Sequence, residues 1–241
     1  MSNDPQQVAE SIAEFAAKLR AQFQPQEGDA GVRDPGPWWH DRRALLAEVG
    51  FDPRRYGDCR ADVPLQDAPS ERRLQEFFAH LPQYVAEGHW LYLLGAIGTR
   101  KTGSMARLAL ALEYHDFPLE RGQMNPALVR YRFAPEVAGD FAALGTGQST
   151  GAMHVMLGAR VVMLDDVHRW LEVGGYVRES IMAGWDTFTE LRDGHGVTVV
   201  SANLTKPGME QVSQFRAGLD RARGRGEIIE IRGTSTRGQA L

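Results

Sequence analysis

The sequence predicts an α/β fold, in which a parallel sheet carries helices on both of its faces. Three observations predict it, and each is a buried apolar strand that ends in polar residues. The polar groups are the loop Gly95–Thr102, the pair Asp165-Asp166, and Asn203. Open parallel sheets bind their ligands at the carboxyl ends of the strands, so we expect these groups to meet at one edge. Together they predict a nucleoside-triphosphate-binding fold.

Strands and helices alternate from about residue 70 onwards. Continuous apolar runs such as Val161–Leu164 are typical of strands that are buried on both faces. The predicted strands are Trp90–Leu94, Val129–Phe133, Arg160–Leu164, Val197–Ser201 and Glu227–Ile231. The predicted helices are Ser70–Glu87, which Pro82 kinks or ends early, Lys101–Tyr114, Pro135–Ala143, Val177–Arg192 and Glu210–Arg223. Gly145–Gly158 is rich in small residues and is predicted to be a mobile loop.

The first 60 residues are predicted to form a separate helical segment and linker. Asp4-Pro5 is a favourable helix start. Apolar residues then recur every three or four positions, at Val8, Ile12, Phe15, Leu19 and Phe23. Such an apolar face needs a covering surface, either on its own domain or on a partner. We therefore expect a partner-docking segment over residues 1–60 and a second domain over residues 61–241.

Composition limits the compartment and the partners. The net charge is −4, so any nucleic-acid binding requires a local basic patch. The single cysteine, Cys59, excludes an intramolecular disulfide and is typical of a reducing cytoplasm. The sequence has neither an apolar run long enough to span a membrane nor a signal peptide. We expect a cytoplasmic protein with no membrane partner.

The loop after the first strand resembles the phosphate-binding pattern G-x-x-x-x-G-K-[ST], with Arg100 where the second glycine belongs. In such a loop, backbone N–H groups at a helix N-terminus bind phosphate. Lys101 is expected to reach the β- and γ-phosphates, and Thr102 to bind Mg²⁺. The predicted nucleotide-binding residues are Gly95, Ala96, Ile97, Gly98, Thr99, Arg100, Lys101 and Thr102.

The polar ends of the other two strands complete the predicted site. A carboxylate beside a phosphate loop can hold Mg²⁺, and its neighbour can activate the attacking water. We assign Asp165 to the metal and Asp166 to the water. Asn203 is expected to position that water or to contact the γ-phosphate.

These motifs are similar to those of the AAA+ ATPases of the DnaC/IstB group, which include bacterial and phage replicative-helicase loaders and the ATPase helpers of some transposons. The resemblance covers about residues 50–241. It rests on Gly50–Tyr56, Gly95–Thr102, Met163–Val167, Ser201–Leu204 and the tail Leu219–Arg237. It implies ATP and Mg²⁺, a three-layer αβα P-loop NTPase core without a C-terminal lid, and assembly into a homo-oligomeric ring or spiral.

In this group an arginine of the adjacent subunit completes the ATP site. Counting back from Asp220-Arg221 places that arginine at Ala217, so the finger is Arg216, Arg221 or absent. Arg237 matches the arginine of the closing motif. Residues 133–158 contain no Lys or Arg, so any contact with single-stranded DNA there is expected to be weak or indirect.

The favoured function is an ATP-dependent helicase loader, which docks on the replicative helicase through residues 1–60 and assists its loading on single-stranded DNA during replication initiation. One alternative is an IstB-like transposition helper, although His168–Tyr176 lacks the Leu-Pro step usual in those proteins. The other is an adaptor of the same fold that does not hydrolyse ATP because Arg100 has degraded the phosphate loop. The sequence leaves open whether ATP is turned over.

Overall fold

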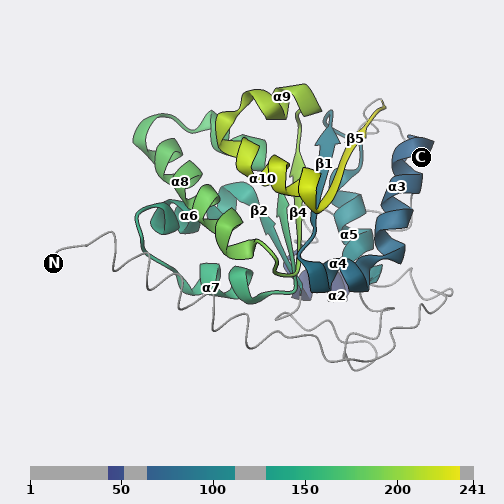
Figure 1. Ribbon diagram of the computed structural model, residues 1–241, viewed down its shortest axis with the longest axis horizontal. Coiled ribbons are helices and arrows are strands. Elements are labelled where there is room, and N and C mark those ends of the chain that lie inside the picture. Colours follow the sequence, from purple (N-terminus) through teal and green to yellow (C-terminus); the bar gives the residue numbers. More distant parts are fainter. Residues whose placement is uncertain (1–42, 52–63, 112–128, 234–241) are drawn as a thin grey trace.

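The computed structural model describes residues 43–51, 64–111 and 129–233. They form a five-stranded parallel sheet in the order β2-β3-β4-β1-β5, covered by helices on both faces (Figure 1). The predicted fold class, a parallel α/β sheet with helices on both of its faces, is confirmed. The predicted helix over residues 4–23 lies outside the described residues. Among the described residues, the last helix or strand is β5. No described helix has the length and apolar character needed to cross a membrane.

All five predicted strands are present, with ends that differ by at most one residue. They are β1 (Trp90–Gly95), β2 (Val129–Phe133), β3 (Val161–Asp165), β4 (Val197–Ala202) and β5 (Gly226–Ile231). Every residue of β1, β3 and β4 is buried, which explains their continuous apolar sequences. Because β4 pairs with both β1 and β3, the end of β4 lies between the phosphate loop and the acidic pair.

The helices connect the strands in the predicted order. They are α2 (Arg43–Glu48), α3 (Ala68–Ala79), α4 (Leu81–Glu87), α5 (Lys101–Ala111), α6 (Ala138–Gly145), α7 (Gly151–Gly158), α8 (Gly175–Arg192), α9 (Lys206–Gln211) and α10 (Ser213–Gly224), with 3₁₀ turns η2 (Ala134–Val137) and η3 (Val167–Glu172). The predicted helix over residues 70–87 is interrupted at His80, and Pro82 stands in the first turn of α4, where proline is tolerated. The predicted helix over residues 210–223 is likewise divided, at Val212.

The prediction of a mobile loop over Gly145–Gly158 is wrong, because α7 occupies its second half. The Thr150 hydroxyl accepts a hydrogen bond from the Met153 N–H at 3.1 Å and caps the helix. Met153, Met156 and Leu157 are all buried. Their spacing of three and four residues is that of a helix face, and this signal outweighs the glycine content of the stretch.

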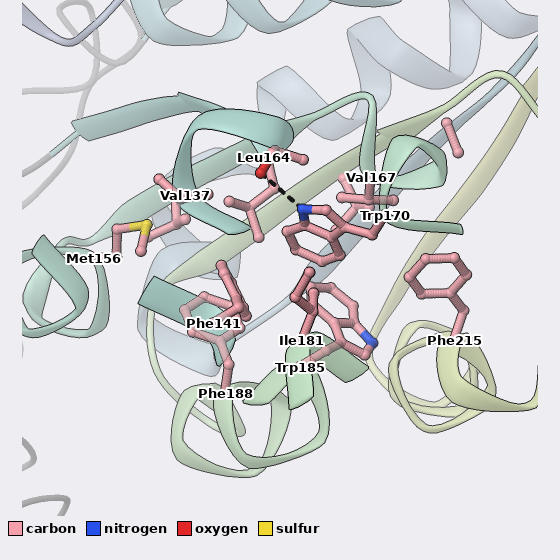
Figure 2. Close-up of a cluster of buried hydrophobic side chains, with 14 of the residues drawn as sticks. Val137, Phe141, Met156, Leu164, Val167, Trp170, Ile181, Trp185, Phe188 and Phe215 are labelled. Atoms are coloured by element: carbon pink, nitrogen blue, oxygen red, sulfur yellow. Dashed lines mark hydrogen bonds between the residues drawn. The ribbon is translucent and has the colours of Figure 1, made fainter. Parts of the chain in front are cut away.

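Side chains of each strand alternate between two cores. Trp90, Tyr92 and Leu94 of β1 pack against α6, α7, α8 and α10, whereas Leu91 and Leu93 face α3, α4 and α5. The first core is rich in aromatic rings (Figure 2), with centroids 4.7 Å apart for Phe141 and Trp170 and 5.8 Å apart for Trp170 and Trp185. The buried Trp170 indole donates to the Ala134 carbonyl at 2.7 Å.

The short described stretch before residue 52 belongs to the second core. Leu46, Val49 and Phe51 are buried there. The Val49 carbonyl accepts a hydrogen bond from the Tyr131 N–H at 2.8 Å, and the Phe51 ring stacks on the Tyr131 ring with centroids 3.8 Å apart. The end of the predicted docking segment therefore packs on the sheet. The division of the chain at residue 60 stays a prediction.

Candidate nucleotide and magnesium site

The candidate site lies at the carboxyl edge of the sheet, where β1, β3 and β4 end. Alternation along the strands decides which side chains can meet there. Tyr131, Asp165 and Ser201 all point to the face that α5 covers, because they follow the same alternation as the apolar residues of that core. Thr102 stands in the first turn of α5 and approaches the three from that side.

Three hydroxyl groups surround the carboxylate of Asp165. The Thr102 hydroxyl donates to Oδ2 at 2.7 Å, and the Tyr131 hydroxyl donates to the same oxygen at 2.7 Å. The Ser201 hydroxyl donates to Oδ1. Asp165 is only 1% exposed, so these bonds replace the water that the charge loses on burial.

Thr102 and Asp165, the two predicted metal ligands, are thus brought together. Tyr131 and Ser201 were missed by the sequence analysis. The sequence shows only that each is a hydroxyl residue on the otherwise apolar face of its strand, and strand pairing decides that this is the face of Asp165.

The backbone of the phosphate loop is left-handed at three positions. The φ angles are 143° at Gly95, 83° at Gly98 and 67° at Arg100. A Cβ at Gly95 would lie 2.5 Å from the Ile231 carbonyl oxygen, so this position requires glycine. Arg100 adopts the left-handed conformation without being glycine, at a cost of about 1 kcal/mol. Its carbonyl accepts the Ser104 N–H at 2.9 Å, and α5 continues from it.

Lys101 turns back onto its own loop. Its ammonium group donates to the carbonyls of Gly95 at 3.0 Å and Ala96 at 2.8 Å, and the side chain is only 5% exposed. The Thr99 hydroxyl also donates to the Ala96 carbonyl, at 2.9 Å. Ile97, by contrast, is half exposed at the outside of the loop. Lys101 therefore stabilises the conformation of the loop. To contact a phosphate, its ammonium group would have to exchange its hydrogen bonds to these carbonyls for hydrogen bonds to phosphate oxygens.

Asp166, His168 and Asn203 form the third part of the site. The Asp166 N–H donates to the Ser201 hydroxyl at 3.0 Å, and its φ of 62° is left-handed. The Asn203 N–H donates to Nδ1 of His168 at 3.2 Å, while the Asn203 amide nitrogen lies 3.1 Å from Nε2 of the same ring. Oδ1 of Asp166 is 3.9 Å from Nδ1. His168 was not predicted from the sequence as a site residue.

The surroundings of His168 favour the neutral form of its ring. Burial, followed by the positive charge of Arg169, lowers the pKa of His168 below its ordinary value. A neutral ring has a free lone pair, which Nδ1 needs in order to accept the Asn203 N–H.

The predicted arginines lie on or beyond α10. Arg216 is exposed in the first turn of α10, and Arg221 is half-buried further along the same helix. Arg237 lies outside the described residues.

The residues present fit Mg²⁺ held jointly with a nucleotide. Mg²⁺ takes oxygen ligands, commonly one or two protein groups completed by phosphate oxygens and water, and Thr102 and Asp165 supply a hydroxyl and a carboxylate. Within the described ranges no group of three or more His, Cys, Asp and Glu side chains could hold a metal by itself.

No protein-family model matches the chain, and no curated protein matches it either. Among solved structures it is similar to the DnaC helicase loader, with 18% identity and a TM-score of 0.48 over 74% of this chain and 99% of that one. It is also similar to a DNA replication initiation factor (17% identity, TM-score 0.49) and to the replication initiator DnaA bound to AMPPCP and single-stranded DNA (16%, 0.49). The matches cover 69% and 71% of this chain but only 46% and 48% of those proteins. Because the identities and TM-scores are this low, the likeness carries no argument about what the chain binds.

Proposed function

We propose that the chain binds ATP with Mg²⁺ at the carboxyl edge of its sheet. Residues Gly95–Thr102 enclose the phosphates, Lys101 contacts the β- and γ-phosphates, and Thr102 and Asp165 hold the metal. One observation carries the proposal, the 2.7 Å hydrogen bond from the Thr102 hydroxyl to the buried Asp165. A hydroxyl that donates to a carboxylate keeps its lone pairs for a cation, so the pair is already arranged as two neighbouring oxygen ligands.

We propose that the same residues hydrolyse the bound ATP. Asp166 activates the attacking water, and Asn203 positions it opposite the γ-phosphate. The finger, Arg216 or Arg221 of a neighbouring copy in a ring or spiral, stabilises the charge that develops on the phosphoryl group. Arg237 of the tail acts as the arginine of the closing motif. The exposure of Arg216 in the first turn of α10 leaves it accessible to such a copy.

The biological task that we propose is helicase loading. It rests on the resemblance of the motifs over residues 50–241 to the DnaC/IstB group, and on the amphipathic pattern of residues 8–23. Residues 1–60 dock on the replicative helicase, and the ATPase domain over residues 61–241 assists the transfer of the helicase to single-stranded DNA. Residues 133–158, which lack Lys and Arg, contribute little to DNA binding.

Titration with a fluorescent ATP analogue in the presence of Mg²⁺ tests nucleotide binding. We expect saturable binding that Lys101→Ala weakens by about tenfold or more, since a charge-assisted contact to phosphate is lost. Lys206→Ala, at an exposed lysine of α9, is the matched control and should bind as the wild type does. Binding that is absent in the wild type, or equal in Lys101→Ala, would contradict the proposal.

Turnover of ATP is tested separately by phosphate release. We expect Asp166→Asn to lose turnover while retaining nucleotide binding, because the carboxylate acts on the water and not on the phosphates. Asp193→Asn, at an exposed residue after α8, removes the same charge elsewhere and should keep full turnover.

Docking on the helicase is tested by co-elution with the replicative helicase of the same source. Deletion of residues 1–24 should abolish co-elution and leave nucleotide binding intact. Within the expected helix, Phe15→Asp on the apolar face should act like the deletion, whereas Ala17→Asp on the opposite face should not. Co-elution that survives the deletion excludes this role for the segment.

A second candidate is a nucleotide-binding adaptor that does not hydrolyse ATP. The left-handed Arg100 in the phosphate loop favours it, because its side chain adds bulk and charge where glycine lets the backbone approach a phosphate. Saturable binding of the analogue by the wild type with no phosphate release would support the adaptor. Turnover that disappears in Asp166→Asn would exclude it.

A further inference from the structure

His168 lies between the two residues that the proposed hydrolysis places beside the water. It stands in η3, after Asp166, and its side chain is 12% exposed. Both ring nitrogens face Asn203, Nδ1 at 3.2 Å from its backbone nitrogen and Nε2 at 3.1 Å from its amide nitrogen. Nδ1 is also 3.9 Å from Oδ1 of Asp166. One ring thus touches the end of β4 and faces the acid at the end of β3.

We propose that His168 is a positioning residue for ATP hydrolysis, which holds the side chain of Asn203 in the direction that places it on the attacking water. The inference rests on the proposed function, and it assigns to that site a residue that does not itself contact ATP.

The two contacts restrain Asn203 more strongly than either would alone. A single bond to the backbone N–H fixes where the residue stands but leaves χ1 and χ2 free. With Nδ1 accepting, Nε2 carries the ring proton, so the Asn203 amide group presents its oxygen, the acceptor, to Nε2. This second contact selects one side-chain direction, and a preorganised polar group costs less to align in the transition state. The neutral state of the ring is consistent with this role, since Nδ1 must accept a hydrogen bond.

The ring acts on Asn203 and not on Asp166. At 3.9 Å, Nδ1 and the Asp166 carboxylate oxygen are beyond hydrogen-bond range. Removing the ring therefore releases the side chain of Asn203.

Steady-state ATP turnover by His168→Ala, His168→Gln and the wild type tests the proposal. Misplacing the water affects the chemical step, so we expect His168→Ala to lower kcat by about tenfold while KM for ATP changes less than about twofold. His168→Gln keeps an acceptor near the Asn203 N–H and should recover most of kcat. His154→Ala, at an exposed histidine of α7, is the matched control and should behave as the wild type.

The wild type and the variants answer different questions. A wild type that binds no ATP analogue contradicts the proposed function. A wild type that turns over ATP, with His168→Ala at the same kcat, overturns the role of His168 alone. A merely structural role would lower the melting temperature of both variants and leave kcat per folded molecule unchanged, which also overturns the proposal.

One readout does not depend on turnover. In ¹⁵N-labelled protein, a hydrogen bond from the Asn203 N–H to His168 Nδ1 should give a measurable coupling between the two nitrogens. Detection supports the geometry on which the inference stands. Absence of this coupling in wild-type protein whose other amide resonances show the native fold contradicts the geometry.

Discussion

The two halves of the candidate site differ in how well their polar groups are satisfied. In the metal half, the buried Asp165 accepts hydrogen bonds from Thr102, Tyr131 and Ser201. In the phosphate half, Arg100 is held at a φ of 67°, and its Nε is buried without a hydrogen-bond partner in the described part of the chain. The metal half is relaxed and the phosphate half is strained.

This difference shows which feature of the phosphate loop the chain has kept. The left-handed backbone at position 100 is the conformation that a glycine would adopt without cost, and it persists although the side chain has changed. Gly95, Gly98 and Lys101 keep the shape of the loop around it. The departure from the phosphate-binding pattern is therefore confined to one side chain, and four substitutions can test this contrast.

The largest effect is expected in the metal half, from Asp165→Asn. The substituted amide lacks the negative charge that would bind Mg²⁺. Its NH₂ group also faces hydroxyl donors and has no lone pair with which to accept their hydrogen bonds. We expect Mg²⁺-dependent turnover to fall by about 100-fold or more and the free energy of unfolding to fall by about 2–3 kcal/mol. Phosphate release and urea denaturation measure the two. Asp193→Asn serves as control, and an unchanged stability would show that the three hydroxyl contacts are unimportant.

The next effect concerns the support of α5, the helix that begins at the phosphate loop. Burial opposes the ionisation of Glu71, but hydrogen bonds from Arg107, Gln75 and the Leu65 N–H outweigh it and lower its pKa to about 2. The ionised carboxylate therefore stabilises the fold above pH 4.5, and this contribution is lost as the pH falls towards 2.

We expect Glu71→Gln to lower the free energy of unfolding by about 2 kcal/mol at pH 7, because the two 2.6–2.8 Å bonds from Arg107 lose their charged acceptor. Urea denaturation from pH 7 to pH 3 measures this free energy. The difference in free energy of unfolding between variant and wild type should narrow as the pH falls below 4.5. Glu190→Gln, at an exposed residue of α8, is the control. A free-energy difference that stays constant with pH would show that the stabilisation does not come from the charge of Glu71.

Tyr131→Phe should have a moderate effect in the metal half. It removes one of the three hydroxyl donors to Asp165 and keeps the ring stacked on Phe51. We expect the free energy of unfolding to fall by about 1–1.5 kcal/mol. The Mg²⁺ concentration needed for half-maximal turnover should rise several-fold. Tyr176→Phe, at a ring that is 73% exposed, is the matched control for loss of a hydroxyl.

The smallest effect, and the one of opposite sign, is expected from Arg100→Gly. Removing the side chain relieves the left-handed strain, so we expect the free energy of unfolding to rise by about 0.5–1 kcal/mol. Binding of the ATP analogue should tighten in the same variant. Arg100→Ala keeps the strain and removes the charge, so it separates the two causes. Equal binding by Arg100→Gly and wild type would show that Arg100 already lies clear of the phosphates.

The strands were predictable because β1, β3 and β4 are buried on both faces and therefore consist mainly of apolar residues. The helix α7 was not, because its glycines masked the spacing of Met153, Met156 and Leu157. The proximity of Thr102 and Asp165 was predictable, since one follows the loop after β1 and the other ends β3 at the same edge of the sheet. Tyr131 and His168 could not, because their roles depend on pairing register and on a 3₁₀ turn.

The packing of Phe51 on Tyr131 affects how a fragment that carries the candidate site should be prepared. A protein shortened to begin at residue 61 would lack Val49 and Phe51, so the Tyr131 N–H would lose its acceptor and one side of its ring would meet solvent. Poor nucleotide affinity in that fragment would report the lost cover over Tyr131, not the affinity of the whole chain. Fragments that retain Arg43 and everything after it keep this cover, and they are the ones from which affinities should be measured.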